Sequence, residues 1–199
     1  MKPGGVVPVV LEGHGIRLEP LTEAHGDALA AAASDGRLWE FWYIAVPPPE
    51  GMKEYVTDAL KGQRDGHMLP WAVRDLPTGA IVGSTRYHDI APAIDRVEIG
   101  HTWYAKRAQR TAINTECKLM LLAHAFEKLA CIAVEFRTHW FNHASREAIA
   151  RLGAKQDAVL RNHQLMPDGS KRDTVVFSII DGEWPAVKRH LKFQLERPR

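Results

Sequence analysis

The chain has 199 residues, of which 45% are hydrophobic and 25% are charged, a composition typical of a folded globular protein rather than a disordered or fibrous one. Its 26 lysines and arginines exceed the 24 aspartates and glutamates by only two, so the net charge gives no reason to expect a nucleic acid or a membrane as partner. This length predicts a single domain over residues 1–199.

Two cysteines, Cys117 and Cys131, lie in apolar stretches and are not spaced as a Cys-x-x-Cys motif. The Gly- and Pro-rich start of the chain does not match a signal peptide, and no apolar run of about 18 residues predicts a membrane span. We therefore expect buried, reduced thiols and a cytoplasmic location.

The first half of the chain alternates predicted strands and helices. Apolar residues at every second position favour strands, and the alanine-rich and proline-initiated segments favour helices. In chain order we expect a strand at 16–20, a helix at 23–33, a helix that follows the prolines at 47–49 and ends near Gly62, and an antiparallel pair of strands at 69–75 and 80–90.

The second half continues this alternation. The helix expected from Thr115 to Leu129 is amphipathic, so its apolar stripe should pack on the sheet while Lys118 and Glu127 face solvent. Around it we expect strands at 96–104, 131–139, 154–165 and 172–180, a helix from Asn142 or Ala144 to Leu152, and a last helix from Asp181 or Glu183. Together these elements predict an α/β (α+β) fold with a mixed sheet.

A basic loop connects the strand at 96–104 to the helix at Thr115. It carries Arg107, Gln109 and Arg110, next to the backbone N–H groups and the positive dipole end of that helix. This arrangement predicts a phosphate-binding site, and the alternative is an ordinary solvated basic turn.

Several segments in this order resemble the GNAT superfamily of acyl-CoA-dependent N-acetyltransferases, and within it the ribosomal-protein N-terminal-alanine acetyltransferases. The resemblance spans nearly the whole chain and implies a mostly antiparallel sheet of about seven strands flanked by helices. The segments that carry it are VEIGHTWY, TECKLMLLAHAFEKL, VEFRTHWFNHASREAIARLGA, VLRNHQLMPDGSKRDTVVFSI and EWPAV.

The resemblance also implies an acetyl-CoA site. The family's pyrophosphate signature begins with Gln or Arg, matched by Gln109, but Ala112 stands where the family usually has glycine. A Cβ there hinders close approach of the backbone to phosphate and disfavours a positive φ, and Arg110 could compensate with a charged contact. The implied contact residues are His101, Thr102, Trp103, Gln109, Arg110, Thr111, Ala112, Ile113, Asn114, Thr115, Asn142 and Ser145.

Acetyl transfer to an amine requires a base, because a free amine is largely protonated at neutral pH. Glu98 is the first candidate, since it lies on the strand that opens to admit the cofactor in the resembled fold. Backbone amides around His101 to Trp103 could polarise the thioester carbonyl. The alternative is a structural ion pair between Glu98 and Arg86 or Arg96.

Ser145 is the second candidate catalytic residue. Asn142 and Ser145 match the family's Asn-x-x-Ser, in which the Asn contacts the cofactor and the Ser protonates the departing thiolate. Helix capping would explain both residues equally well. In the ribosomal-protein branch a glutamate proposed as base aligns with Gln164, so the base here must be Glu98, His163 or a water molecule.

Two further patterns bear on ligands. His139 and His143 are spaced i, i+4 but straddle a strand end, so we expect no metal site. The aromatic residues Trp39, Phe41, Trp42 and Tyr43 either line an acceptor pocket or form a buried cluster.

The prediction is therefore an enzyme that transfers an acetyl group from acetyl-CoA to a primary amine, on a protein N-terminus or a small molecule, by direct attack. Two alternatives stay open. One is a non-catalytic acyl-CoA-binding or regulatory protein, favoured by Ala112 and Gln164, and the other is an interaction scaffold without the cofactor. Exposed sheet edges and the last helix also suggest a homodimer.

Overall fold

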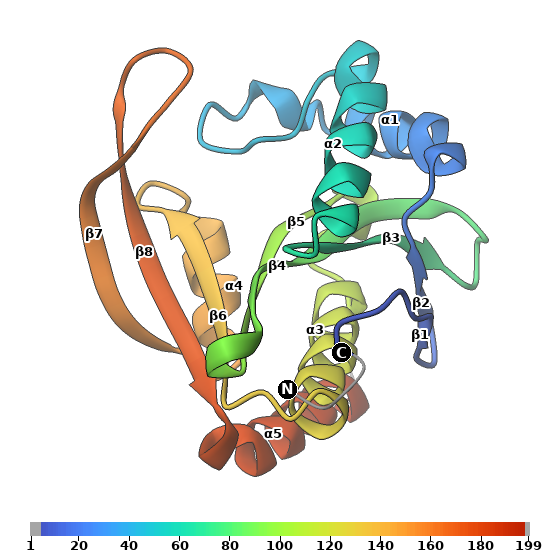
Figure 1. Cartoon of the computed structure of the whole chain (residues 1–199). Coiled ribbons are helices and arrows are strands. Elements are labelled where there is room, and N and C mark those ends of the chain that lie inside the picture. The colour runs from blue at the N-terminus through green and yellow to red at the C-terminus, as the bar shows by residue number, and fades with distance from the viewer. Residues whose placement is uncertain (1–4, 198–199) are drawn as a thin grey trace.

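The computed structural model describes residues 5–197, and its centre is one eight-stranded sheet (Figure 1). Residues 1–4 and 198–199, the two ends of the expected domain, lie outside the described part. The spatial order of the strands is β1-β2-β3-β4-β5-β6-β8-β7. The strands are β1 (Leu11–Glu12), β2 (Ile16–Pro20), β3 (Leu69–Asp75), β4 (Ile81–Ala91), β5 (Arg96–Tyr104), β6 (Ala133–His139), β7 (Lys155–Leu165) and β8 (Lys171–Ile180).

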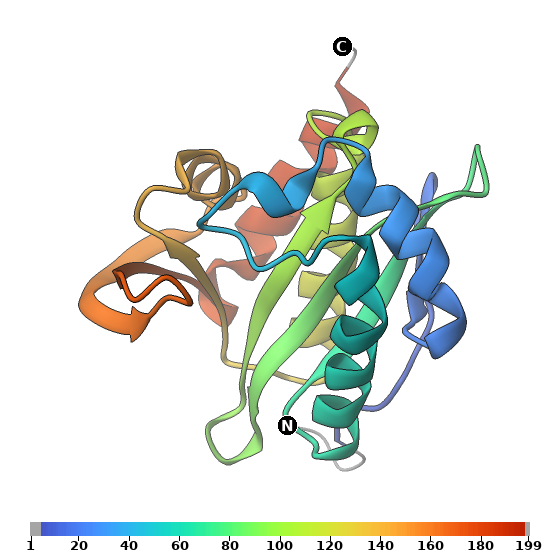
Figure 2. The ribbon, with the colours of Figure 1, turned by 90° about the horizontal axis from the view of Figure 1, so that it is seen from above.

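Helices cover both faces of this sheet (Figure 2). They are α1 (Gly26–Ser34), α2 (Met52–Arg64), α3 (Ile113–Ala123), α4 (His143–Arg151) and α5 (Trp184–Glu196). One buried cluster joins α1 and α2 to one face, and a larger cluster joins α3 and α5 to the other. The expected mixed, mostly antiparallel fold flanked by helices is confirmed.

The parallel pair of β5 and β6 is short. It consists of the register partners Arg96–Ala133, Val97–Val134 and Glu98–Glu135, and all other neighbouring strands are antiparallel. Beyond Glu98 the two strands diverge, as Figure 2 shows. In the part of the chain that the structure describes, no strand pairs with the β6-facing edge of β5 after this point.

The point beyond Glu98 where β5 and β6 diverge is called the fork below. Two irregularities interrupt the pairing of β4 with β5 near it. The register shifts between Ser84 and Arg86, where His101 adopts a φ of 47°, and again between His88 and Ala91, where Asp89 adopts a φ of 44°. Each shift is a β-bulge, which redirects side chains and often lies beside a functional site.

Most sequence-based boundaries agree with the structure to within two residues, and β3 and β5 match their expected ranges. One strand was missed, because β1 has only two residues and shows no alternation. Cys117 and Cys131 are buried free thiols, as expected. Among residues 5–197 no helix has the length and apolarity needed to cross a bilayer.

The central helix departs from its predicted description in three ways. It begins at Ile113 rather than Thr115, and residues His124–Lys128 continue it as a π-helix. Lys118, expected in solvent, is only 4% exposed. The reason is that α3 packs between the sheet and α5, so more of its circumference is covered than a single apolar stripe predicts.

Glycine at position 83 allows β4 to approach β5. A Cβ on Gly83 would overlap the backbone oxygen of Trp103, which cannot move without disturbing the ladder. We expect Gly83→Ala to lower the free energy of unfolding by about 1–3 kcal/mol in urea denaturation. The matched control is Gly26→Ala in α1, where a Cβ meets no atom within 4 Å and stability should stay equal or rise slightly. Equal stabilities for the two variants would contradict this packing.

Candidate functional site

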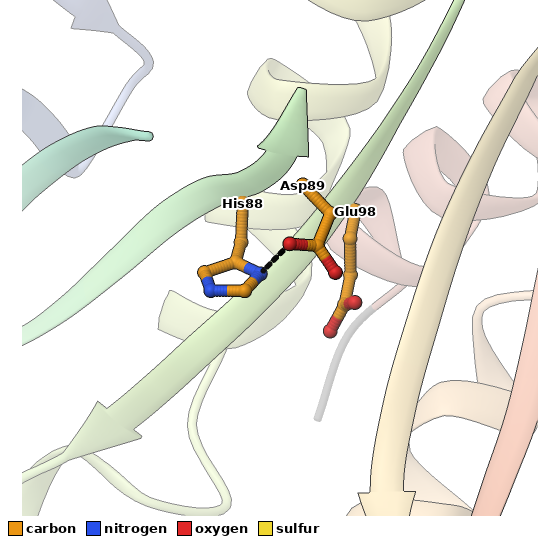
Figure 3. A group of neighbouring side chains, drawn as sticks. All are labelled: His88, Asp89 and Glu98. Carbon is orange, nitrogen blue, oxygen red and sulfur yellow. Dashed lines mark ion pairs between the residues drawn. The ribbon is translucent and has the colours of Figure 1, made fainter. Parts of the chain in front are cut away.

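Glu98 lies at the fork between β5 and β6, as the last residue of the parallel ladder. The residue is only 8% exposed, and its side chain points to the same place as those of His88 and Asp89 (Figure 3). Burial raises the pKa of Glu98 to about 7, although the positive charge of Arg137 acts in the opposite direction. A carboxyl group with this pKa exchanges a proton readily at neutral pH.

Arg137 of β6 is the ion-pair partner of this group. Its Nε atom is 3.6 Å from Glu98 Oε2 and 2.6 Å from Glu135 Oε1, and its Nη1 atom is 3.3 Å from Asp89 Oδ2. The alternative of a structural ion pair therefore involves Arg137 and not the two arginines expected. Arg96 pairs instead with Glu135.

Arg86 also lies apart from Glu98. Its guanidinium group stacks 4.4 Å above the ring of Tyr55 in α2, and the residue is 3% exposed. Among the described residues, its Nε and Nη2 atoms have no hydrogen-bond partner. This buried cation therefore lies on the α2 side of the sheet without a carboxylate beside it.

His88, Asp89 and Glu98 form the one group among residues 5–197 with metal-ligand geometry, since their ligand atoms all lie within 4.8 Å of one another. Figure 3 shows the ion pair between His88 Nδ1 and Asp89 Oδ1, which are 3.0 Å apart. Arg137 contacts both carboxylates, so a cation there would meet an existing positive charge. The arrangement suits proton exchange by Glu98 better than metal binding.

His101, Thr102 and Trp103, whose backbone amides are predicted to polarise the thioester carbonyl, point their side chains in alternate directions. His101 is exposed, but the protein atoms beside its ring and the positive charge of Arg86 still lower its pKa, so the ring, whose centroid lies 5.1 Å from that of His88, is neutral at pH 7. Trp103 is buried under α2, where its Nε1 donates to the Tyr55 hydroxyl at 3.0 Å. Thr102 points to the opposite face, toward α3.

The loop before α3 holds its shape through its own side chains. Gln109 Nε2 donates to the oxygen of Tyr104 at 2.9 Å, and Thr111 Oγ1 donates to the oxygen of Ala108 at 2.7 Å. Arg107 is already paired with Asp35. Arg110 is exposed and is therefore the better placed of the two arginines to meet an anion.

Ala112 does not carry the backbone strain expected of it. Its φ of −69° and ψ of −20° are right-handed helical, and the left-handed residue of this loop is Arg110, with a φ of 58°. Ala112 is the N-cap of α3 and makes no side-chain capping bond. The N–H of Ile113 donates to Thr111 Oγ1 at 3.3 Å, so the N–H groups of Asn114 and Thr115 are the ones open to an anion. Thr115 is buried and accepts from Arg151 Nη2 at 3.2 Å, so its hydroxyl joins two helices.

The capping interpretation of the Asn-x-x-Ser segment is confirmed for Asn142. Its Oδ1 accepts a hydrogen bond from the backbone N–H of Ser145 at 3.0 Å, at the start of α4. Both residues are half-buried. This role leaves the Ser145 hydroxyl for other uses.

The aromatic connection between α1 and α2 reaches the end of β6. The Trp42 ring lies 4.8 Å from the ring of His139 and 5.9 Å from that of Phe141, and Trp42 is 54% exposed rather than buried. A cavity of about 660 Å³ opens there, lined by these residues and by the β7–β8 hairpin. His163 is an exposed residue of that hairpin and contacts the Thr174 hydroxyl at 3.1 Å.

Sequence reasoning missed Arg137 and Arg172, whose charges act on the Glu98 carboxyl group. Alternation along β6 was the available signal for Arg137, because it places Glu135, Arg137 and His139 on one face. Nothing in the sequence revealed Arg172, since it lies on β8, two strands away from Glu98 in the sheet, and acts through its charge.

Comparisons with known proteins agree with this architecture. The family model described as acetyltransferase (GNAT) domain matches residues 16–155. The uncharacterized N-acetyltransferase YoaA of Bacillus subtilis (strain 168) is 22% identical over 176 residues, which cover 86% of this chain and 96% of YoaA.

Solved structures show the same fold. A GCN5-related N-acetyltransferase from Brucella melitensis has a TM-score of 0.84 at 29% identity, covering 94% of this chain and 85% of that one. RimL, a ribosomal L7/L12 α-N-protein acetyltransferase in complex with coenzyme A, has a TM-score of 0.74 at 16% identity, covering 87% and 99%. The domain match, together with these likenesses, shows that the chain belongs to the GNAT family of acetyl-CoA-dependent acetyltransferases.

Proposed function

We propose that this enzyme transfers the acetyl group of acetyl-CoA directly to a primary amine, with Glu98 as the general base. The observation that carries the proposal is the position of Glu98, a buried carboxyl group at the fork of β5 and β6 whose pKa is raised to about 7. The chain acts as one catalytic unit in the cytoplasm and needs no metal.

The raised pKa suits the task of Glu98. An amine attacks a thioester only in its neutral form, so a proton must leave the ammonium group before or during attack. Near pH 7 about half of the Glu98 carboxyl groups are ionised and can accept that proton, while Arg137 keeps the ionised form accessible. The proton can then return to solvent past Asp89, which is exposed.

The backbone beyond Glu98 supplies the other half of the site. The β6-facing edge of β5 is unpaired after the fork, so its amides around His101 to Trp103 can donate to the thioester carbonyl. The amides of the first turn of α3 and the side chain of Arg110 suit the pyrophosphate. When the C–S bond breaks, the electron pair stays on sulfur, and the Ser145 hydroxyl is the proposed proton donor to the thiolate.

The acceptor enters from the aromatic side. Trp42 and Phe141 offer apolar surface at the cavity, while Asp168 and Lys171 supply charges at its rim. This lining admits either a protein N-terminus or a small amine with an apolar part. The chain resembles RimL in fold, and RimL acts on a ribosomal protein terminus, which favours the first class as the starting point for assays.

Acetyl-CoA should raise the melting temperature of the protein, because a ligand that binds only the folded state stabilises it. Arg110→Asn removes the loop's exposed charge while keeping a residue that tolerates a left-handed φ. We expect it to weaken acetyl-CoA binding about 10-fold in calorimetry, the loss of one charged hydrogen bond. Lys128→Asn, at an exposed lysine beyond α3, is the control. No thermal shift for the unaltered protein would favour the scaffold alternative.

Glu98→Gln should lower kcat roughly 100- to 10,000-fold, with little change in the KM for acetyl-CoA, because it removes only the base. Turnover is followed as CoA release with a panel of peptide N-termini and small amines. Since the base must be ionised, activity of the unaltered enzyme should fall as the pH drops below about 7. The exposed Glu196→Gln is the control. An unchanged kcat in Glu98→Gln would assign the base elsewhere, to His163 or to water.

A further inference from the structure

Lys118 is a buried cation in the middle of α3. The residue is 4% exposed, and its Nζ donates to Thr102 Oγ1 at 2.8 Å. Burial lowers its pKa to about 8, so at neutral pH the group is still mainly an ammonium ion.

This charge has no carboxylate partner. Within residues 5–197 no ion pair involves Lys118. The titratable group that interacts with its charge is the neighbouring Cys117. Burial raises the pKa of Cys117 to about 12, so this group is a neutral thiol. An ammonium ion removed from water without a counter-ion destabilises a fold, so an apolar side chain of similar size would serve packing better. Packing therefore does not explain a lysine here.

The hydrogen bond of Lys118 connects it to the β-bulge that follows Glu98 in β5. Thr102 follows His101, the bulged residue of β5, and its Oγ1 also contacts Thr85 Oγ1 of β4 at 2.7 Å. The ammonium group thus lies against the α3 side of the same short stretch whose unpaired edge faces the gap. Arg86, the other buried cation without a carboxylate, flanks this stretch on the α2 side.

We propose that Lys118 is an electrostatic positioning residue, which lies behind the bulge at Thr102 and stabilises the negative charge that develops on the thioester during transfer. This inference rests on the proposed placement of acetyl-CoA along the open edge of β5. Negative charge appears there twice, on the carbonyl oxygen when the amine adds and on the sulfur when the C–S bond breaks. Lys118 keeps its proton throughout, and its fixed charge lowers the energy of both species without reorganisation.

The leaving group provides a test that needs no acceptor. Bound CoA carries a thiol, and a nearby positive charge lowers the pKa of that thiol, which is followed by the ultraviolet absorbance of the thiolate. We expect the thiol pKa of CoA bound to Lys118→Met to be higher by about one unit than in the unaltered protein, a tenfold change in the ionisation constant. Lys128→Met, the same substitution at an exposed lysine, should leave it unchanged.

Lys118→Gln separates charge from hydrogen bonding, because its amide can still donate to Thr102 Oγ1. It should raise the thiol pKa as Lys118→Met does. Lys118→Met should also melt at a higher temperature than the unaltered protein, since a buried charge is removed. A purely structural lysine predicts the opposite, a lower melting temperature and an unchanged thiol pKa.

The outcomes distinguish this inference from the proposed function. If the unaltered protein binds CoA but both Lys118 variants leave the thiol pKa unchanged, the role of Lys118 is wrong while the function stands. If Lys118→Met raises the thiol pKa but Lys118→Gln leaves it as in the unaltered protein, the hydrogen bond to Thr102 acts and the charge does not. If the unaltered protein does not bind CoA, both proposals fall.

Discussion

The short parallel ladder between β5 and β6 is the constraint on which the rest of the site depends. Three residue pairs hold the two strands together, and after Glu98 the antiparallel partner β8 continues with β6 while β4 continues with β5. The sheet therefore divides into two halves that share one seam. At the end of that seam lie a buried carboxyl group and an open strand edge with unsatisfied hydrogen-bonding capacity, which is where an extended ligand can add to a sheet.

The charges around this seam are costly for stability and informative about function. Glu98 keeps a raised pKa because burial outweighs the attraction of Arg137. Lys118 and Arg86 lie on opposite faces of the β4–β5 ladder, each buried and without a carboxylate partner among the described residues. A fold selected only for stability would replace such groups with apolar side chains. Their retention beside the bulge at His101 fits a site that accommodates negative charge when substrate is bound.

Period-two and helical patterns predicted nearly all elements of the fold, because strands such as β2 carry buried apolar residues at alternate positions and α3 carries a wide apolar stripe. The position of Glu98 at the fork followed from resemblance. Alternation along β6 places Arg137 on one face with Glu135 and His139, but its pairing with Glu98 depends on the register between strands, which the sequence does not show. The burial of Lys118 was mispredicted because the position of α5 over α3 cannot be read from α3 alone. Ala112 was expected to strain the loop, but the left-handed φ falls on Arg110, two residues earlier.

Burial at the fork of β5 and β6 makes Glu98 a base suited to neutral pH. The most direct test is a carbon-detected NMR titration of the side-chain carboxyl groups, with the Glu98 signal assigned by its absence in Glu98→Gln. We predict a titration midpoint of about 7 for this carboxyl group. A midpoint close to the ordinary glutamate value of about 4.3 would contradict it, because a carboxyl group fully ionised at neutral pH is a weak base for an ammonium substrate.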